Sequence, residues 1–534
     1  MSPRLAVLLS SAALPLIALP AVAQDVVQTA PEETEVEEIV VVGVLTDTVL
    51  DREEIERTQA NDLADLFRST PSVAVGGGVG IAQKIYVRGL EDSLLNVTVD
   101  GAPQRGTLFH HIGRVSIEPE LLETVSLQAG AGEATSGFGA IGGAIRFRTR
   151  DAVDLLEPGQ DFGTMLKAGW FSNDGQKYSA TGYGRLFGDI GVLASYVHVD
   201  RDNYQDGDGT ERTATGAIQE LGFLKIGGDL GGGHRISASY ELRNEAATFG
   251  QRPNWAPLVG GAVFPGEGQR DTAVLNHGYD TGNGFSIEST AYWTRTEFTQ
   301  DRFDRWGLYG ADIESFGFDV RGRFETANNT LVVGVENRND TVVSQYLGDP
   351  AMWQPWAWDP AIGRFEETGE LYGLYAQNQW QATDRLRVSF GARFDDYEMD
   401  QETYGDGTTS DGVSFNAGLN YEIVDGLTFN AGYAEVFRGK EIGDGFTLEK
   451  RPGTLSLQPD LAPETVENVE VGLKWVRDGF TASAVYYDMA IDDVILDQLA
   501  GPVFYENVGR FESDGIELRA GYRWDAFAVD GFFN

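Results

Sequence analysis

From about residue 163 onward, short segments alternate between apolar and polar side chains and are separated by turns rich in Gly, Asn and Asp. The pattern is clearest in "LRVSFGARF", residues 386–394. A β-strand places successive side chains on opposite faces, so this segment has one apolar and one polar face. The apolar face holds Leu386, Val388, Phe390, Ala392 and Phe394, and the polar face holds Arg387, Ser389, Gly391 and Arg393.

The lengths of the connections separate two β architectures, a soluble sandwich and a membrane barrel. Tight turns such as "FGD", "TGNG", "TANN" and "VDG" alternate with long insertions. The insertions cover residues 200–215, 243–272, 339–368, 398–412 and 438–463. Short turns on one rim and long loops on the other are typical of a transmembrane barrel. We therefore expect a mainly β fold with a large antiparallel transmembrane barrel over residues 163–534, and the soluble sandwich remains the alternative.

The N-terminus indicates export. Arg4 is followed by an apolar run that ends in Ala21-Val22-Ala23, the pattern of a secretory signal peptide over residues 1–23. Pro15 and Pro20 interrupt the run, which is short for a membrane span, so a retained anchor is the weaker alternative.

Composition restricts the partners. Lys plus Arg is 40 and Asp plus Glu is 82, which gives a net charge of −42. This excess argues against nucleic acid and against anionic lipid surfaces as partners. The exported chain has no cysteine, so no disulfides stabilise it, but its 534 residues are enough to bury a core without them.

Between the signal and the barrel, two further regions are expected. Residues 24–50 form an acidic leader that contains the apolar run "EEIVVVG" at 37–43. Residues 51–152 are expected to form a small mixed domain, with helical spacing at Leu63, Leu66 and Phe67 and strands at "KIYVRGL" and "LLNVTVDG". The glycine-rich "GAGEATSGFGAIGGA" lacks the lysine of a phosphate-binding loop, so we interpret it as a place of close backbone approach.

The segments "IYVRGL", "VTVDGAP" and "IEPELLETVSLQAGAGEATSGFGAIGGAIRFRTR" resemble the plug of TonB-dependent outer-membrane receptors. The resemblance implies an energy-coupled importer with an N-terminal α+β plug in the lumen of a 22-stranded barrel. It also implies that Glu38, Ile39, Val40, Val41 and Val42 form a TonB box that contacts the TonB–ExbB–ExbD complex, although 38–43 as the first plug strand is an alternative. Because we count roughly sixteen to eighteen strand candidates, we expect the chain to lack the last barrel strands.

Within that family, "GTLFHHIGRVSIEPEL" looks most like the plug of haem receptors of the haemoglobin, transferrin and lactoferrin type. The resemblance places His111 as the ligand of haem iron, with His110 as helper, and neutral imidazole suits iron. Arg105 and Arg114 are candidate partners of anionic groups such as haem propionates. Haem is then a transported ligand and no intrinsic cofactor is expected. A ferric siderophore, or a purely structural histidine pair, remains open.

A second haem-receptor mark is degenerate here. "VFRGKE", with Phe437 and Arg438, and "LQPDLAPET" stand where the family has FRAP-like and NPDL-like motifs. No histidine lies between them at 439–458, so the second axial ligand would be His110, a tyrosine or Met352.

Three tryptophans in one predicted loop, Trp353, Trp356 and Trp358, are candidates for stacking on a flat ligand or a carrier protein, with packing inside the loop as the alternative. Catalytic motifs such as G-x-S-x-G and H-E-x-x-H are absent from the sequence, so no enzyme is expected. Two classes remain: import of haem, a ferric siderophore or another scarce nutrient, and a non-transporting outer-membrane barrel such as a porin or adhesin.

Overall fold

The computed structural model describes residues 48–77, 80–105, 108, 112–115, 117–253, 261–498, 501–524 and 527–534. The predicted signal peptide, the predicted TonB box, and the pair His110 and His111 lie outside the described residues.

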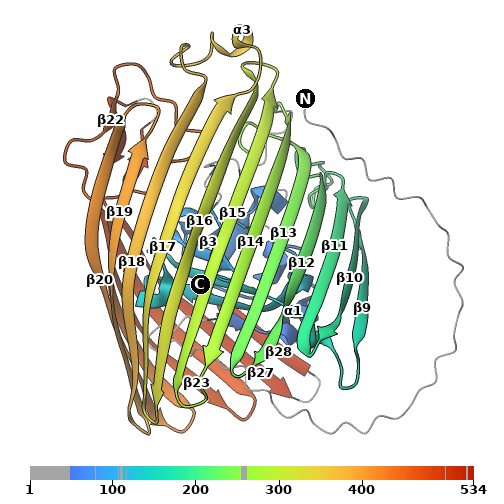
Figure 1. The fold of residues 1–534 in the computed structure, drawn as a ribbon, viewed down its shortest axis with the longest axis vertical. Coiled ribbons are helices and arrows are strands. Elements are labelled where there is room, and N and C mark those ends of the chain that lie inside the picture. Colours follow the sequence, from blue (N-terminus) through green and yellow to red (C-terminus); the bar gives the residue numbers. More distant parts are fainter. Residues whose placement is uncertain are drawn as a thin grey trace, which may run out of the picture. The chain divides into compact units, whose positions relative to one another are not determined.

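Seventeen of the described strands form one sheet that curves into a barrel, and Figure 1 shows these long strands side by side. They are β9 (Phe162–Phe171), β10 (Gly175–Phe187), β11 (Asp189–Arg201), β12 (Ala217–Gly231), β13 (His234–Phe249), β14 (Phe264–Asp280), β15 (Phe285–Arg302), β16 (Gly307–Thr326), β17 (Asn329–Tyr346), β18 (Arg364–Thr383), β19 (Leu386–Gln401), β20 (Asp406–Val424), β21 (Leu427–Arg438), β23 (Glu464–Arg477), β24 (Phe480–Asp492), β27 (Phe511–Trp524) and β28 (Phe527–Phe533).

Neighbouring barrel strands pair antiparallel in chain order, from β9 with β10 to β27 with β28. The ordering places β28 beside β9, but no register pairs these two strands within the described residues. The number of strands agrees with the count of candidates in the sequence and is below the 22 that the resemblance implies. The interpretation of the chain as lacking its last strands stays a prediction.

Apolar side chains face outward and polar side chains face the lumen, as a membrane barrel requires. In β19, Phe390 and Phe394 are exposed on the outer face, whereas Ser389 and Arg393 are buried on the face toward the lumen. A soluble sandwich would bury the apolar face instead. The antiparallel membrane-type barrel predicted from the sequence is therefore confirmed, and the sandwich alternative is wrong.

The connections alternate in length as predicted, but the strands reach further into the long-loop rim than the sequence indicated. Residues 243–249 and 264–272 belong to β13 and β14, which pair with each other up to Phe249 and Phe264. The predicted loop 398–412 shrinks to the turn between β19 and β20. Polar residues near the rim weaken the alternation without preventing backbone pairing, which is why these boundaries were missed.

The domain before the barrel contains two small sheets and short helices. One sheet has the order β1 (Thr48–Leu50), β7 (Leu122–Ala129), β8 (Gly143–Thr149), β5 (Asn96–Val99) and β6 (Ala102–Pro103), and the other has β2 (Val73–Gly76), β3 (Lys84–Val87) and β4 (Leu90–Glu91). The helices are α1 (Arg52–Thr58), α2 (Leu63–Leu66) and five 3₁₀ turns at Gly80–Ala82, Asp92–Leu94, Pro119–Leu121, Ala134–Ser136 and Val153–Leu155. The strands and the helical spacing predicted for this region are present.

The small domain has its own core and also touches the barrel wall. Ile55, Leu63, Phe67 and Phe147 are buried together in this core. Gln59 ends α1 in a left-handed conformation, and the Asp62 side chain caps α2, so two short helices replace one. β6 contacts β14 and β15 of the barrel, which makes this domain the plug of the lumen.

Additional short elements lie at the rim of the barrel that carries the long loops. They are the helix α3 (Pro350–Trp353) and a three-stranded sheet of β22 (Leu455–Leu457), β26 (Val503–Asn507) and β25 (Ile495–Asp497). None of the described helices has the length and apolar character needed to cross a membrane.

The barrel topology predicts a depth-dependent effect of charge on the outer face. Leu224 lies in the middle of β12 with 45% of its surface exposed, and Leu230 lies near the tight turn of the same strand with 56% exposed. Leu224→Arg should destabilise the barrel by about 2–4 kcal/mol because a guanidinium near the bilayer centre is poorly solvated. Leu230→Arg should cost about 0–1 kcal/mol. Reversible urea unfolding in lipid vesicles measures both, and equal costs would contradict the assigned outer face.

Candidate functional site

Arg105, a predicted partner of anionic ligands, is buried and already faces carboxylates. It follows β6 at the edge of the plug, and its side chain is 6% exposed. Its Nη2 lies 2.8 Å from Oε2 of Glu441, and its Nε lies 3.7 Å from Oδ2 of Asp340 on β17. The guanidinium therefore joins the plug to the barrel wall and to the loop that follows β21.

Arg114, the second predicted arginine, lies in the same charged environment. Its backbone N–H donates to Asp92 (3.2 Å), and its Nη2 donates to the carbonyl of Ser93 (2.9 Å). Burial and the nearby positive charge of Arg105 lower the pKa of Arg114 to about 9. The carboxylates of Asp92 and Glu441 oppose this lowering, and the group remains a cation at neutral pH.

Arg438, from the FRAP-like motif at the end of β21, contacts groups that Arg105 and Arg114 also contact. Its Nη1 donates to Glu464 (2.9 Å), its Nε lies 3.2 Å from Oε1 of Glu441, and its Nη2 reaches the carbonyl of Ser93 (3.4 Å). Phe437 beside it is buried and packs edge-on against Tyr397, with 5.9 Å between ring centroids. The structure thus brings the plug arginines and the FRAP-like motif together.

Glu441 is the residue that sequence reasoning missed. Its carboxylate contacts Arg105, Arg338 of β17 and Arg438, and its side chain is 4% exposed. Burial alone would raise the pKa of Glu441, but the surrounding guanidinium groups hold that pKa well below its usual range. The sequence signal was only an acid in "VFRGKE", since nothing local indicates that three distant arginines meet it.

Residues 439–454, which we call the capping loop, fold inward from the rim over the plug. Glu441 to Gly445, Thr447 and Leu448 are all buried. Ile442 and Leu448 belong to an apolar cluster with plug residues Leu108 and Ile112. The cluster also includes lumen-facing residues of the wall, among them Ala311, Ile313, Val342, Phe365 and Met399.

The predicted iron ligands cannot be placed, but their sequence neighbours can. His110 and His111 lie outside the described residues, between Leu108 and Ile112. Leu108 is 0% exposed and Ile112 is 1% exposed, both in the apolar cluster beneath the capping loop. Within the described residues, no group of three or more His, Asp or Glu side chains could hold a metal ion.

The three predicted loop tryptophans have separate partners and do not share one surface. Trp353 in α3 is buried and stacks on Tyr346, with 4.7 Å between centroids and 6° between planes. The backbone N–H of Trp358 donates to Glu449 (2.6 Å). Trp353 packs within its own loop region, whereas Trp358 contacts the segment 439–454 through Glu449 and Arg451. Trp356 is the one of the three with a half-exposed side chain, so a role in ligand contact stays a prediction for it.

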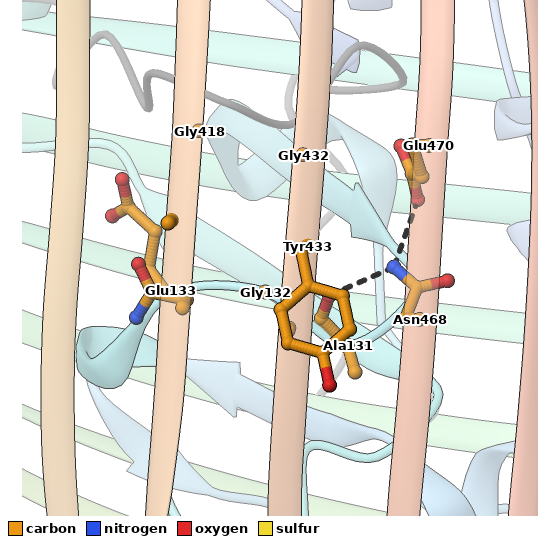
Figure 2. Close-up of a pocket in the computed structure, with 11 residues that line it drawn as sticks. Ala131, Gly132, Glu133, Gly418, Gly432, Tyr433, Asn468 and Glu470 are labelled. Atoms are coloured by element: carbon orange, nitrogen blue, oxygen red, sulfur yellow. Dashed lines mark hydrogen bonds between the residues drawn. The ribbon is translucent and has the colours of Figure 1, made fainter.

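Two small cavities lie between the glycine-rich plug segment and the wall. One lies beside Ala131, Gly132 and Glu133, and Figure 2 shows it between strands that carry Gly418, Gly432 and Asn468. Asn468 donates to the carbonyl of Ala131 across this gap and to Glu470 on its own strand. Glycine and alanine supply much of the lining of this cavity, and it has room for little more than a water molecule, so we do not place the ligand here.

A membrane-type barrel with a separately cored domain contacting its lumen wall defines the class of plugged β-barrels. The sequence agrees with that class. Residues 203–534, more than half of the chain, match the family described as TonB dependent receptor-like, beta-barrel, and residues 45–144 match the TonB-dependent Receptor Plug Domain. The chain belongs to the TonB-dependent receptor family, whose members are outer-membrane receptors and transporters.

Individual proteins and solved structures are also similar to this chain. The chain is 27% identical over 492 residues to the heme transporter BhuA of Brucella ovis, covering 91% of this chain and 72% of that protein. The fold is similar to the FrpB iron transporter of Neisseria meningitidis, with TM-score 0.82, 22% identity and coverage of 92% and 79%. It is also similar to the Serratia marcescens hemophore receptor HasR, solved with its hemophore HasA and heme, with TM-score 0.74, 18% identity and coverage of 91% and 80%.

The burial of Asp444 predicts that the capping loop releases as pH rises. Burial raises the pKa of Asp444 well above its usual range; the Phe446 N–H and Lys84 oppose this shift, while Asp497 and Glu91 add to it. A carboxyl whose pKa is raised in the docked loop favours docking at low pH, and that contribution disappears as pH rises through the docked pKa.

A thiol reporter can measure this release, because the chain has no cysteine. Buried Leu448→Cys should react with maleimide faster at higher pH, relative to exposed Thr210→Cys, which corrects for thiolate formation. The ratio should rise by up to about tenfold per pH unit. Adding Asp444→Asn should remove the pH dependence, and its persistence in that variant would assign it to another group.

Proposed function

We propose that this chain imports haem across the bacterial outer membrane. The observation that carries the proposal is an apolar cluster directly beside buried arginines at the top of the plug, where Leu108 and Ile112 flank the histidine pair in sequence. Haem combines a flat apolar ring, carboxylates and an iron that accepts imidazole. The apolar cluster suits the ring and the buried arginines suit the carboxylates, while the sequence between Leu108 and Ile112 supplies the imidazoles. The names of the relatives, heme transporter and hemophore receptor, support this ligand.

The residue roles follow from this proposal. His111 coordinates the haem iron and His110 assists or replaces it. Arg105 and Arg114 attract the propionates, with Arg438 joining them through the contacts described above. Trp356 contacts ligand or carrier at the mouth, and Phe437 supports the wall beside Arg438. The second axial ligand is His110, a tyrosine or Met352, whose side chain is 44% exposed on α3.

The proposal also includes the location of the protein in the outer membrane and its coupling to TonB. Residues 1–23 direct export, the barrel faces outer-membrane lipid, and the run 37–43 pairs with TonB of the TonB–ExbB–ExbD complex. A short apolar strand-forming run in an acidic leader suits addition to the edge of a partner's sheet. A porin or adhesin has no need of a plug fixed by buried charges, which favours transport.

Substitution of the histidines tests haem ligation. His111→Ala should remove the absorption bands of histidine-bound haem from the purified full chain, because the iron loses its imidazole. The double change with His110→Ala should remove any remaining signal, and His198→Ala on β11 serves as the control. A ferric siderophore receptor would lack haem bands and tolerate both changes. Unaltered haem spectra in the double variant would make the pair structural.

Deletion of the leader motif tests coupling. Removing residues 37–43 should abolish haem uptake by cells while leaving haem binding at the surface unchanged, because only the contact with TonB is lost. The matched control removes residues 26–32, a segment of equal length in the same leader. Uptake and surface-bound haem are measured on the same cells, and normal uptake after deletion of 37–43 would refute the assignment.

A further inference from the structure

The capping loop carries two chemical features side by side. Glu441 presents a carboxylate to three guanidinium groups, and the next residue, Ile442, enters the apolar cluster together with Leu448. A single short segment therefore satisfies both the positive and the apolar parts of the site. An amphipathic ligand with carboxylates has this same combination.

The charged half of the site is built from separate elements. Arg105 comes from the plug, Arg338 from β17 and Arg438 from the end of β21. Asp340 pairs with Arg105 and Arg338, and Glu464 pairs with Arg438. Together with Glu441, three carboxylates face these three guanidiniums, and Arg114 lies nearby with the buried Asp92 beside it. Removing Glu441 alone leaves an excess of buried positive charge, which costs free energy unless another anion replaces it.

Close backbone approach fixes the loop in this position. A Cβ on Gly139 of the plug would lie 2.7 Å from Oε1 of Glu441. A Cβ on Gly445 would lie 2.4 Å from Cδ2 of Leu108 and 2.9 Å from Cβ of Ala311. At Gly445 the loop backbone thus lies directly between the plug residue Leu108 and the wall residue Ala311.

We propose that the capping loop is an internal substitute for the ligand, with Glu441 occupying the binding site for a carboxylate of an amphipathic anion. The incoming carboxylate exchanges with Glu441 on Arg105, Arg338 and Arg438, and the apolar body of the ligand replaces Ile442 and Leu448. This inference rests on the proposed transport function and names the group on the ligand that opens the site. For haem, the exchanging group is a propionate.

Esterification of the ligand tests whether its carboxylates are needed, because it removes their charge and keeps the ring and the iron. Ferric protoporphyrin IX and its dimethyl ester share the ring and iron, but the ester has no carboxylate. The free acid should bind the full chain about tenfold more tightly than the ester and should accelerate maleimide labelling of Leu448→Cys, because it expels the loop. The ester should leave the labelling rate unchanged. Equal acceleration by both compounds would overturn the exchange.

Substitution of Glu441 tests, without any ligand, whether its carboxylate holds the capping loop in place. Glu441→Gln keeps the shape but removes the charge, so labelling at Leu448→Cys should rise about tenfold. Glu441→Asp, which keeps the charge on a shorter side chain, should give an intermediate rate, and exposed Glu402→Gln should have no effect. An unchanged rate in Glu441→Gln would refute the role of Glu441.

The two experiments distinguish the inference from the proposed function. If neither porphyrin binds, the proposal of haem import is wrong, and exchange with a haem carboxylate is wrong with it. Faster labelling in Glu441→Gln would in that case still show that Glu441 holds the capping loop in place. If haem binds with its histidine spectrum but does not change the labelling of the loop, haem import stands and the exchange is wrong.

Discussion

Buried ion pairs between the plug and the lumen wall are the interaction on which the rest of the structure depends. Arg88 of the plug lies 2.5 Å from Glu470 and 2.9 Å from Glu517, with all three side chains almost fully buried. Such pairs add little net stability, but losing one partner costs about 3–5 kcal/mol because the other charge stays buried. They therefore fix the orientation of the plug, and with it the position of Arg105 beside the capping loop.

A charged interface between the plug and the wall differs from an apolar one in the cost of separating it. Separating an apolar interface would expose hydrophobic surface to water, whereas separated ion pairs are rehydrated. The outer face of the barrel has the opposite chemistry, with exposed aromatic and aliphatic side chains such as Phe390 and Leu224. Membrane anchoring and plug retention thus depend on different faces of the same strands.

The sequence predicted the fold well because alternation and turn chemistry are local. It identified the outward face of β19 through Phe390 and the plug strands through their short apolar runs. It also indicated that Arg105 and Arg438 belong to the site. It could not reveal Glu441, because the contact joins residues 336 positions apart, from Arg105 to Glu441, and no local pattern records it. A different limit applies to Trp353. Its stacking partner Tyr346 is close in sequence but lies at the end of a strand that the pattern had assigned to a loop.

The pairing of charge and apolar surface in one loop gives the site its selectivity. A small anion could compete for Arg105 but would leave Ile442 and Leu448 without replacement, and burying each aliphatic side chain is worth about 1.5–3 kcal/mol. A neutral apolar molecule could fill the cluster but would leave the arginines unpaired once Glu441 departs, at a comparable or larger cost. Only a ligand that replaces both contributions displaces the loop at low concentration. Under the proposed exchange, the docked capping loop therefore rejects small anions and neutral hydrophobic molecules, because neither kind of molecule replaces both Glu441 and the two aliphatic side chains.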